Sequence, residues 1–320
     1  LERCTTRAGH NAMASWRLDD KVAIVTGAGN GLGKEYALYL ASLGAKVVVN
    51  DLGSSTTGSG SSSSAADAVV NDIKQAGGEA VANYDSVVEG EKIVQTAIST
   101  YGRVDIVINN AGILRDVSFK RMSEKDWEAV YQVHLKGAFK VTRAAWPHME
   151  TNGYGRIVNI TSPVGLYGNF GQANYVAMKR ALVGFTLTLA LEGAKKEIKA
   201  NVVAPYAASR MSKTVMSSEM LEALPAAPVA KFIAFLCHEK CPESGGIFEL
   251  GGNWVSKVRL QRSRGVQFRD GFDLEDISAH FKEICDFGEG SEFPTEGMSG
   301  MGHAMAARQK PPQGKTEAKL

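Results

Sequence analysis

The sequence predicts an α/β fold in which helices cover both faces of one doubly wound, seven-stranded parallel sheet, within a single domain. Three observations support this prediction. Short apolar runs alternate along the chain with segments of helical periodicity. A glycine-rich turn joins the first run to the first helix, and polar or acidic residues follow the ends of several later runs. In such folds ligands bind where the parallel strands end.

The expected strands lie at 21–25, 46–51, 80–84, 104–109, 156–161, 200–205 and 246–250. Helices are expected after the glycine turn, at 65–75, 91–101 and 229–236, and in two longer segments around His134 and Tyr175. Ser123 and Asp126 have the spacing of a capping box and should start the helix that carries His134. We expect residues 53–64 to form a flexible surface loop and residues 206–228 a mobile lid.

Composition excludes several classes of protein. The chain has 36 Lys and Arg against 34 Asp and Glu, which is not the basic excess of a nucleic-acid-binding protein. The cysteines are too few and too unevenly spaced for a disulfide framework or a zinc site, so we expect no metal; they are Cys4, Cys237, Cys241 and Cys285. No apolar stretch approaches the roughly 18 residues of a membrane span, so we expect a soluble protein.

The two ends of the chain differ from its middle. Met13 offers a natural start, so we expect residues 1–15 to be a disordered or non-native extension ahead of a domain at 16–256. Residues 257–287 should form a helical extension packed on that domain, and 288–320 a disordered tail. The tail ends in Ala318-Lys319-Leu320, which resembles the S-K-L peroxisomal address with Ala in place of Ser. We therefore expect a peroxisomal import receptor as a partner and the peroxisome as the location.

The first glycine-rich turn has the features of a Rossmann-type dinucleotide site. Gly27, Gly31 and Gly33 follow an apolar run and precede a helix, so backbone N–H groups and the helix N-terminus can receive a pyrophosphate. The strict G-x-G-x-x-G pattern is not met, because Leu32 stands where its third glycine would fall. Asp51 lies eighteen residues after Gly33, where a carboxylate favours the ribose of NAD over the 2′-phosphate of NADP; alternatively, it caps the next turn.

Further polar residues follow other strands. Asp85, with Ser86 and Val87, could contact an adenine, and Asn110 could approach the nicotinamide end of a cofactor or form a plain structural turn. These strand ends should meet in one crevice, because parallel strands place their carboxyl ends at the same edge.

The chemistry is predicted to centre on Tyr175 and Lys179. Their spacing of four places both on one face of a helix. A free phenol has a pKa of about 10 and is a poor base, whereas a nearby fixed positive charge lowers that value towards the working range. Ser162 follows the strand before this helix, so its hydroxyl could meet the same substrate oxygen as the phenol.

These motifs together resemble the short-chain dehydrogenase/reductase family. They are T-G-x-x-x-G-x-G at 26–33, N-N-A-G at 109–112, and Ser162 followed by Y-x-x-x-K at 175–179. The likeness covers residues 21–252. At 49–53, 81–87, 110–116 and 167–175 the sequence is similar to the branch that forms the dehydrogenase unit of the peroxisomal D-specific multifunctional enzymes of fatty-acid β-oxidation.

The resemblance implies oxidation of a (3R)-3-hydroxyacyl-CoA to the 3-oxoacyl-CoA with NAD⁺, by a homodimer or tetramer. Tyr175 would take the hydroxyl proton, Ser162 would hold the substrate oxygen, and Lys179 would bond the nicotinamide ribose and lower the tyrosine pKa. The expected cofactor-binding residues are Gly27, Asn30, Gly31, Leu32, Gly33, Asp51, Asp85, Ser86, Val87, Asn110, Tyr175, Lys179, Ala207 and Ala208.

Two other hypotheses stay open. The same chemistry could act on a steroid or another secondary alcohol. The chain could also be a catalytically silent NAD-binding or assembly protein, although the intact set of Ser162, Tyr175 and Lys179 argues against this.

The sequence departs from the family pattern at a few positions. His134 stands where most of the family has the asparagine that holds a water of the proton relay, a trait shared with the multifunctional branch. An imidazole can hold a water and pass a proton, so His134 is a candidate catalytic residue; it could equally be a histidine satisfied within a helix interface. Pro163, Val164 and Tyr206 also differ from the usual residues, and we expect them to alter the shape of the acyl pocket and not the chemistry.

Overall fold

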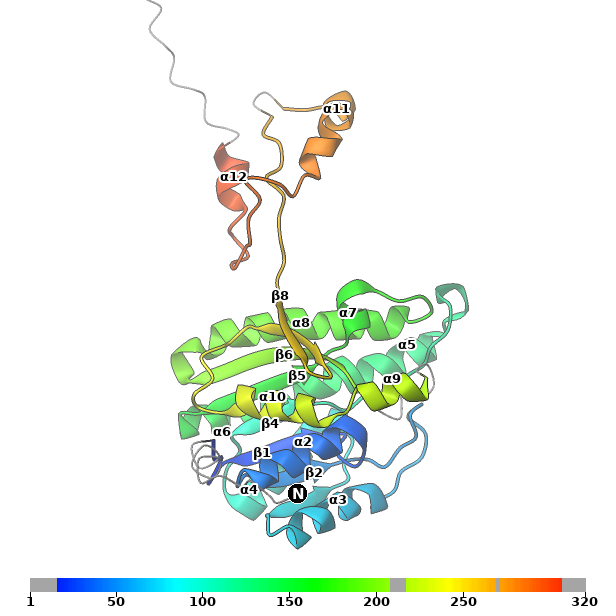
Figure 1. Cartoon of the computed structure of the whole chain (residues 1–320), viewed down its shortest axis with the longest axis vertical. Coiled ribbons are helices and arrows are strands. Elements are labelled where there is room, and N and C mark those ends of the chain that lie inside the picture. The colour runs from blue at the N-terminus through cyan, green and yellow to red at the C-terminus, as the bar shows by residue number, and fades with distance from the viewer. Residues whose placement is uncertain (1–15, 208–216, 269–270, 307–320) are drawn as a thin grey trace, which may run out of the picture. The chain divides into compact units, whose positions relative to one another are not determined.

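The computed structural model describes residues 16–207, 217–268 and 271–306. The chain divides into two compact units at Lys257 and Val258, and the first unit contains the parallel sheet and the helices that cover it (Figure 1). Among the described residues, no helix combines the length and the apolar character needed to cross a membrane.

The sheet confirms the predicted α/β class. Its order is β3-β2-β1-β4-β5-β6-β7-β8, and every pair from β1 to β7 is parallel. The central strands are rich in Val and Ile and are buried on both faces, as expected of a parallel sheet covered on two sides. The strands are β1 (Val22–Thr26), β2 (Lys46–Asn50), β3 (Ala80–Asn83), β4 (Ile106–Asn109), β5 (Gly155–Ile160), β6 (Ile198–Tyr206), β7 (Ile247–Gly251) and β8 (Trp254–Val258).

The eighth strand was not predicted. Only residues 252 and 253 separate β8 from β7, and Gly252 has a φ of +55° that favours glycine. So short a connection cannot make a parallel crossover, so β8 runs antiparallel along the edge of the sheet. Its residues are exposed or half-buried, and its sequence therefore lacks the apolar run by which the other seven strands were predicted.

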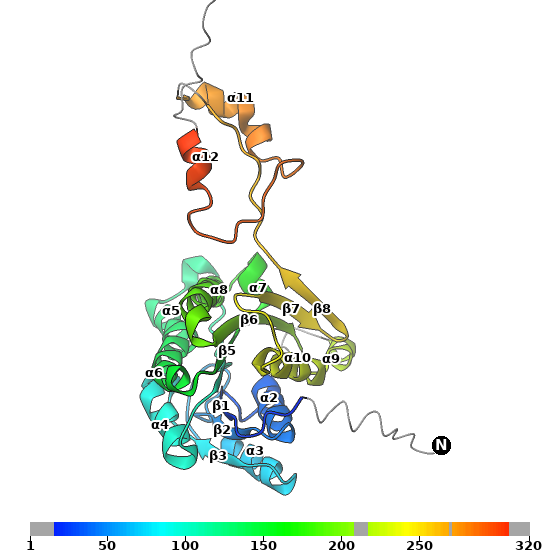
Figure 2. The ribbon, with the colours of Figure 1, turned by 90° about the vertical axis from the view of Figure 1, so that its left-hand side faces the viewer.

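Two layers of helices enclose the sheet, as Figure 2 shows. On one face the buried core joins the sheet to α2, α3 and α10 through side chains such as Tyr36, Ile73 and Ile233. On the other face Ile93, Met149 and other side chains join it to α4, α6 and α8. These helices are α2 (Gly31–Ser42), α3 (Ser64–Gln75), α4 (Gly90–Tyr101), α6 (Gly137–Asn152), α8 (Ala173–Gly193) and α10 (Ala227–Cys237).

The helix that carries His134 begins as predicted but is not continuous. The Ser123 hydroxyl accepts a hydrogen bond from the backbone N–H of Asp126 at 3.1 Å and starts α5 (Glu124–Tyr131). The segment Gln132–Lys136 is then a π-helical turn before α6. A π turn inserts one residue into the helical ladder and shifts the side chains that it carries. The remaining short helices of this unit are η1 (Val87–Glu89), η2 (Phe119–Arg121), α7 (Pro163–Tyr167), η4 (Ala194–Lys196) and α9 (Ser218–Ala223).

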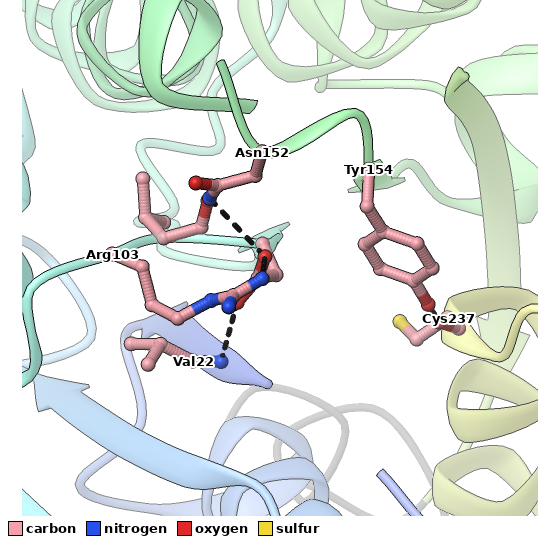
Figure 3. A network of polar contacts seen from close by, with 7 residues as sticks. Val22, Arg103, Asn152, Tyr154 and Cys237 are labelled. Carbon is pink, nitrogen blue, oxygen red and sulfur yellow. Dashed lines mark hydrogen bonds and ion pairs between the residues drawn. The ribbon is translucent and has the colours of Figure 1, made fainter. Parts of the chain in front are cut away.

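A buried polar network ties the amino-end edge of the sheet together (Figure 3). The carboxylate of Asp105, which is fully buried, accepts hydrogen bonds from the backbone N–H of Val22 at 2.9 Å and from the Arg103 guanidinium at 2.7 and 2.8 Å. The side-chain amide of Asn152 donates a further bond at 3.3 Å. Nearby, the Tyr154 phenol donates to the backbone oxygen of Cys237 at 2.5 Å.

The second unit contains α11 (Leu274–Ile284) and α12 (Met301–Ala306). Asp273 and Asp276 form a reciprocal capping box at the start of α11, and residues Arg262 and Glu292 form an antiparallel bridge. The tail predicted to be disordered from residue 288 thus includes a short helix among its described residues. The packing of 257–287 on the domain stays a prediction. Residues 1–15 and the tripeptide 318–320 lie outside the described ranges.

Candidate active site

One cavity of about 650 Å³ lies at the carboxyl ends of the parallel strands. Its lining brings together every predicted site residue that the structure describes. Ala208 lies outside the described residues, as does the part of the predicted lid (206–228) from 208 to 216. The predicted residues in the lining are Gly27, Asn30, Gly31, Leu32, Gly33, Asp51, Asp85, Ser86, Val87, Asn110, His134, Ser162, Tyr175, Lys179 and Ala207.

The glycine turn is held by the residues of the N-N-A-G motif. The Asn110 amide donates to the backbone oxygens of Thr26 at 2.9 Å and Gly27 at 3.1 Å. The Thr26 hydroxyl oxygen accepts bonds from the backbone N–H groups of Asn110 and Ala111. The first and fourth strands thus hold the turn in one conformation. Asn110 acts on the cavity chiefly by shaping the turn.

This turn fits a dinucleotide phosphate. Gly27 has a φ of +64°, and a Cβ on Gly33 would lie 2.2 Å from the backbone oxygen of Gly27, so neither position accepts a side chain. Asn30, the N-cap of the twelve-residue helix α2, makes no side-chain capping bond. The N–H groups of the first turn of α2 therefore stay available to an anion at the helix N-terminus.

Asp51 caps the turn that follows β2, which is one of the two roles that the sequence left open. One carboxylate oxygen accepts from the backbone N–H of Gly53 at 2.7 Å and so caps the turn after β2. The other accepts from Gly29 at 2.7 Å, within the glycine turn. The residue is 8% exposed and lines the cavity. Each oxygen keeps further acceptor capacity, which suits the hydroxyl groups of a ribose.

The catalytic candidates converge at the start of α8. Tyr175 lies in its first turn, and Lys179 lies one turn later with its Nζ 5.5 Å from the centroid of the Tyr175 ring. The Lys179 ammonium donates to the backbone oxygen of Ile160 at 2.7 Å, next to the end of β5. Ser162, which follows β5, makes a side-chain hydrogen bond with Tyr175. The hydroxyl, the phenol and the ammonium therefore face the same part of the cavity.

Burial dominates the electrostatics of this pair. It raises the pKa of Tyr175 to about 12, with a smaller contribution from the charge of Asp116 and an opposing one from the Ser162 hydrogen bond. Burial also lowers the pKa of Lys179 to about 7. The direction for Tyr175 is opposite to the one that we expected from the Tyr–Lys spacing. Removing both side chains from water disfavours the phenolate and the ammonium alike. The spacing of two residues in the sequence does not reveal how deeply they are buried.

His134 lies against Tyr175 with its ring edge-on at 5.1 Å between centroids. It is 2% exposed, and its Nε2 lies 2.8 Å from the backbone oxygen and 3.0 Å from the backbone nitrogen of Ile113. Burial, and then the charge of Lys179, lowers the pKa of His134 well below its ordinary value, so the ring is neutral.

A second cavity of about 10 Å³, the size of one water, shares part of its lining with the first. His134, Asn109 and Lys179 contribute to its lining. Within the described chain, His134 Nδ1 and Asn109 Oδ1 are buried polar atoms without a hydrogen-bond partner. Two such atoms beside one small cavity are the arrangement in which proteins hold an internal water.

Sequence reasoning missed several lining residues. The loop predicted to be a flexible surface segment lines the cavity with Ser55 and Thr56, and the Thr56 backbone oxygen accepts from the N–H of Leu114 at 3.0 Å. Asn169 donates to Gln172 at 2.9 Å, and both line the cavity just before Tyr175. Two amides within a glycine-rich stretch ahead of the Tyr175 helix were the available signal for these residues.

A parallel sheet with a glycine turn, a carboxylate that lines the cavity beside this turn and a Ser–Tyr–Lys cluster defines the class of dinucleotide-dependent oxidoreductases. The family model described as short chain dehydrogenase matches residues 21–221, and the chain belongs to this family. It is therefore an oxidoreductase whose family uses NAD or NADP. No group of three or more His, Cys, Asp or Glu side chains suited to a metal occurs in the described ranges.

Known relatives refine this assignment. The chain is 56% identical over 298 residues to peroxisomal multifunctional enzyme A of Dictyostelium discoideum, an alignment that covers 93% of this chain and 67% of that protein. The structure of full-length peroxisomal multifunctional enzyme type 2 from Drosophila melanogaster matches with a TM-score of 0.78 and 38% identity over 91% of this chain, which spans 49% of that protein. A 7α-hydroxysteroid dehydrogenase complexed with NADH and a 7-oxo bile acid matches with a TM-score of 0.67 and 32% identity, over 74% of this chain and 95% of that one.

Proposed function

We propose that this chain oxidises the hydroxyl group of a (3R)-3-hydroxyacyl-CoA to the 3-oxo group, with NAD⁺ as the oxidant. The observation that carries the proposal is the single cavity in which Ser162, Tyr175 and Lys179 meet the glycine turn and Asp51. Support for the substrate class comes from the likeness to peroxisomal multifunctional enzymes and from the sequence stretches shared with their dehydrogenase units.

The cofactor would be held by the residues that already form the cavity wall. The N–H groups around Gly31 and Gly33 would receive the pyrophosphate, and Asp51 would accept hydrogen bonds from the adenosine ribose. Ser86 and Val87 would contact the adenine. Because a carboxylate repels a 2′-phosphate, we infer a preference for NAD over NADP. When bound, the cofactor accepts the hydride that leaves C3 of the substrate.

The protein would handle the proton. Ser162 would hold the substrate oxygen by a hydrogen bond, and Tyr175 would accept the hydroxyl proton as the C3–H bond breaks. A phenol with a pKa of about 12 is too weakly acidic to be ionised alone, so it needs a positive charge nearby. Lys179, whose pKa lies at about 7, can carry that charge or release its proton near neutral pH. Tyr175 and Lys179 are thus suited to passing one proton from the Tyr175 phenol towards Lys179.

His134 would act as a positioning residue on the same route. Its Nδ1 and Asn109 Oδ1 border the water-sized cavity that Lys179 also lines. A water bonded to both atoms would fix the tautomer of the ring and stand beside the Lys179 ammonium.

We also propose a peroxisomal location. The relative from Dictyostelium is named as a peroxisomal enzyme, and residues 318–320 of this chain resemble the import address that a receptor reads. A fluorescent protein fused ahead of the chain should accumulate in peroxisomes, and removal of residues 318–320 should leave it in the cytosol. Unchanged import after this removal would contradict the role of the tripeptide.

A panel of substrates tests the enzymatic proposal. The absorbance of reduced nicotinamide would be followed with (3R)- and (3S)-3-hydroxyacyl-CoA and a steroid alcohol, each with NAD⁺ and NADP⁺. We expect turnover only of the (3R) thioester and a clear preference for NAD⁺. Turnover of the steroid alone would favour the second candidate, which the likeness to a 7α-hydroxysteroid dehydrogenase supports. Absence of turnover throughout, with NADH still bound, would favour a non-catalytic NAD-binding protein.

A further inference from the structure

A buried carboxylate lies behind the substrate end of the cavity and does not itself line it. Glu249, on β7, is 6% exposed. One of its oxygens accepts a hydrogen bond from the Tyr206 phenol at 2.8 Å, and the other accepts one from the Tyr167 phenol at 2.8 Å. A buried carboxylate that receives two phenol donors is a strong, geometrically defined junction, because hydrogen bonds to a charged acceptor exceed neutral ones in strength.

The two phenols come from two segments that contribute residues to the cavity lining, although Tyr167 itself does not line it. Tyr167 ends α7, the short helix that starts directly after Ser162 and contributes Pro163 and Val164 to the lining. Tyr206 ends β6 and itself lines the cavity. Figure 2 shows α7 beside the ends of β6 and β7. Glu249 thus joins the helix that directly follows Ser162 to the end of β6, the strand that neighbours β5.

The backbone on both sides of this junction is closely packed, whereas the Tyr167 side chain is 66% exposed. A Cβ on Gly251, the partner of Tyr206 in the β6–β7 ladder, would lie 2.5 Å from the Tyr206 Cβ, so Tyr206 packs directly on the neighbouring strand. On the other side, a Cβ on Gly165 would lie 2.6 Å from the Cβ of Lys179, so α7 packs equally closely on α8. Burial, and then the Glu249 bond, raises the pKa of Tyr206 to about 12, so this phenol remains a donor at ordinary pH.

We propose that Glu249 is a positioning and specificity-determining residue, which sets the width of the substrate end of the cavity by bracing Tyr167 against Tyr206. This inference rests on the proposed function, since it holds that the distance between α7 and the end of β6 determines which substrates the cavity accepts. It also gives a reason for the unusual Tyr206: its phenol has an acceptor in Glu249, which holds the ring as part of the cavity wall.

The test compares Glu249→Gln with the parent on a short and a long (3R)-3-hydroxyacyl-CoA. Gln keeps the size of the side chain but offers a single neutral acceptor oxygen, so the brace loosens. We expect kcat/KM for the better substrate to fall about tenfold, and the ratio between the two substrates to move towards one. NADH affinity, measured by fluorescence, should change by less than about twofold, because the glycine turn and Asp51 are untouched.

A matched control is available in the same chain. Tyr84 donates a phenol hydrogen bond to the carboxylate of Asp67 at 2.5 Å, outside the cavity lining. Asp67→Asn therefore removes a comparable charged acceptor and should leave both the ratio and kcat/KM unchanged. If Glu249→Gln lowers kcat/KM for both substrates equally and keeps their ratio, Glu249 is a structural residue only and the proposal is wrong.

A double-mutant cycle isolates the bond itself. Tyr206→Phe removes one donor and keeps the ring, and we expect a smaller shift of the substrate ratio in the same direction as Glu249→Gln. The double variant should be no worse than Glu249→Gln within about twofold, because both changes break the same bond. Fully additive effects would contradict a brace through this phenol.

A substrate-free measurement separates this inference from the proposed function. Hydrogen exchange of the α7 amides, including Gly168, which donates to Val164 at 2.7 Å, should accelerate in Glu249→Gln and not in Asp67→Asn. If the parent oxidises no acyl-CoA, the proposed function fails, whereas accelerated exchange together with a shifted ratio between two steroid alcohols of different size would still support the brace. Unchanged exchange would overturn it.

Discussion

The amino ends and the carboxyl ends of the parallel strands differ in how far their buried polar groups are hydrogen-bonded. At the amino-end edge, the Asp105 carboxylate receives four hydrogen bonds from Val22, Arg103 and Asn152 (Figure 3). At the carboxyl ends of the strands, the Lys179 ammonium is also buried, but within the described part of the chain it has one hydrogen bond, to the backbone oxygen of Ile160. There too, His134 Nδ1 and Asn109 Oδ1 have no partner among the described residues.

This difference separates stability from chemistry. A fully bonded buried charge joins the loop before β4 to β1 and to the end of α6, and it has no capacity left for a ligand. Incompletely bonded groups cost stability but remain free to bond substrate, cofactor or water. We therefore expect substitutions at the amino ends of the strands to change the free energy of unfolding. Substitutions at the carboxyl ends should change the rate of turnover.

The largest expected effect is that of Tyr175→Phe. Removing the proton acceptor should lower kcat at least about 10³-fold, within the range for loss of a general base. The ring still packs against His134, so the melting temperature should change little. The measurement is kcat together with NADH binding. A variant that retains the parent's turnover would remove the proposed mechanism.

Asp105→Ala should have the opposite profile. It leaves the Arg103 guanidinium and the Val22 N–H without this acceptor, and should lower the free energy of unfolding by about 3 kcal/mol. Under native conditions kcat/KM should stay within about twofold of the parent. Urea unfolding and steady-state kinetics check both. Glu79→Gln, which breaks the exposed pair with Lys46 at 3.3 Å, is the control and should cost less than about 1 kcal/mol.

Lys179 should make stability depend on pH. Its pKa is about 7 in the folded chain against an ordinary value of 10.5. Between these values the unfolded chain holds a proton that the folded chain lacks, so the free energy of unfolding should rise with pH across this window. The slope is at most about 1.4 kcal/mol per pH unit. Urea unfolding of the parent and of Lys179→Met between pH 7 and 9 measures it, and parallel curves for the two proteins would exclude this titration.

Asp51→Ala should have the smallest effect of the four. We expect the ratio of kcat/KM for NAD over NADP to fall about tenfold, because the carboxylate no longer repels a 2′-phosphate. Loss of the Gly53 cap should also lower stability slightly. Steady-state kinetics with both cofactors checks the prediction, and an unchanged ratio would leave Asp51 only its role as a cap.

Much of this architecture could be predicted because it follows from short patterns of apolar and polar residues in the sequence. The strands β1, β2 and β5 each contain consecutive apolar residues, and the parallel sheet was predicted from the alternation of such runs with helices. The common location of Gly27, Asp51 and Ser162 in one cavity follows from the geometry of parallel strands. Edge strand β8 was missed because its mostly exposed residues carry no apolar run.

Features that depend on depth or on distant partners could not be predicted. The π turn at Gln132–Lys136 keeps the spacing of an ordinary helix in the sequence, yet it sets the position of His134. The raised pKa of Tyr175 reflects burial, which the spacing to Lys179 does not encode. The brace at Glu249 joins residues that are 82 and 43 positions away in the chain. Each of these features could be recognised only in the folded structure.

The most direct test of the central claim is the initial rate of NADH formation by the purified chain with (3R)- and (3S)-3-hydroxyacyl-CoA at equal concentration. One phenol and one hydroxyl on a single wall can present only one face of the substrate carbon to the cofactor. We therefore predict a rate with the (3R) thioester at least about 100-fold above that with the (3S) thioester. Equal rates, or a preference for the (3S) substrate, would contradict the assignment of Ser162 and Tyr175 to this oxidation.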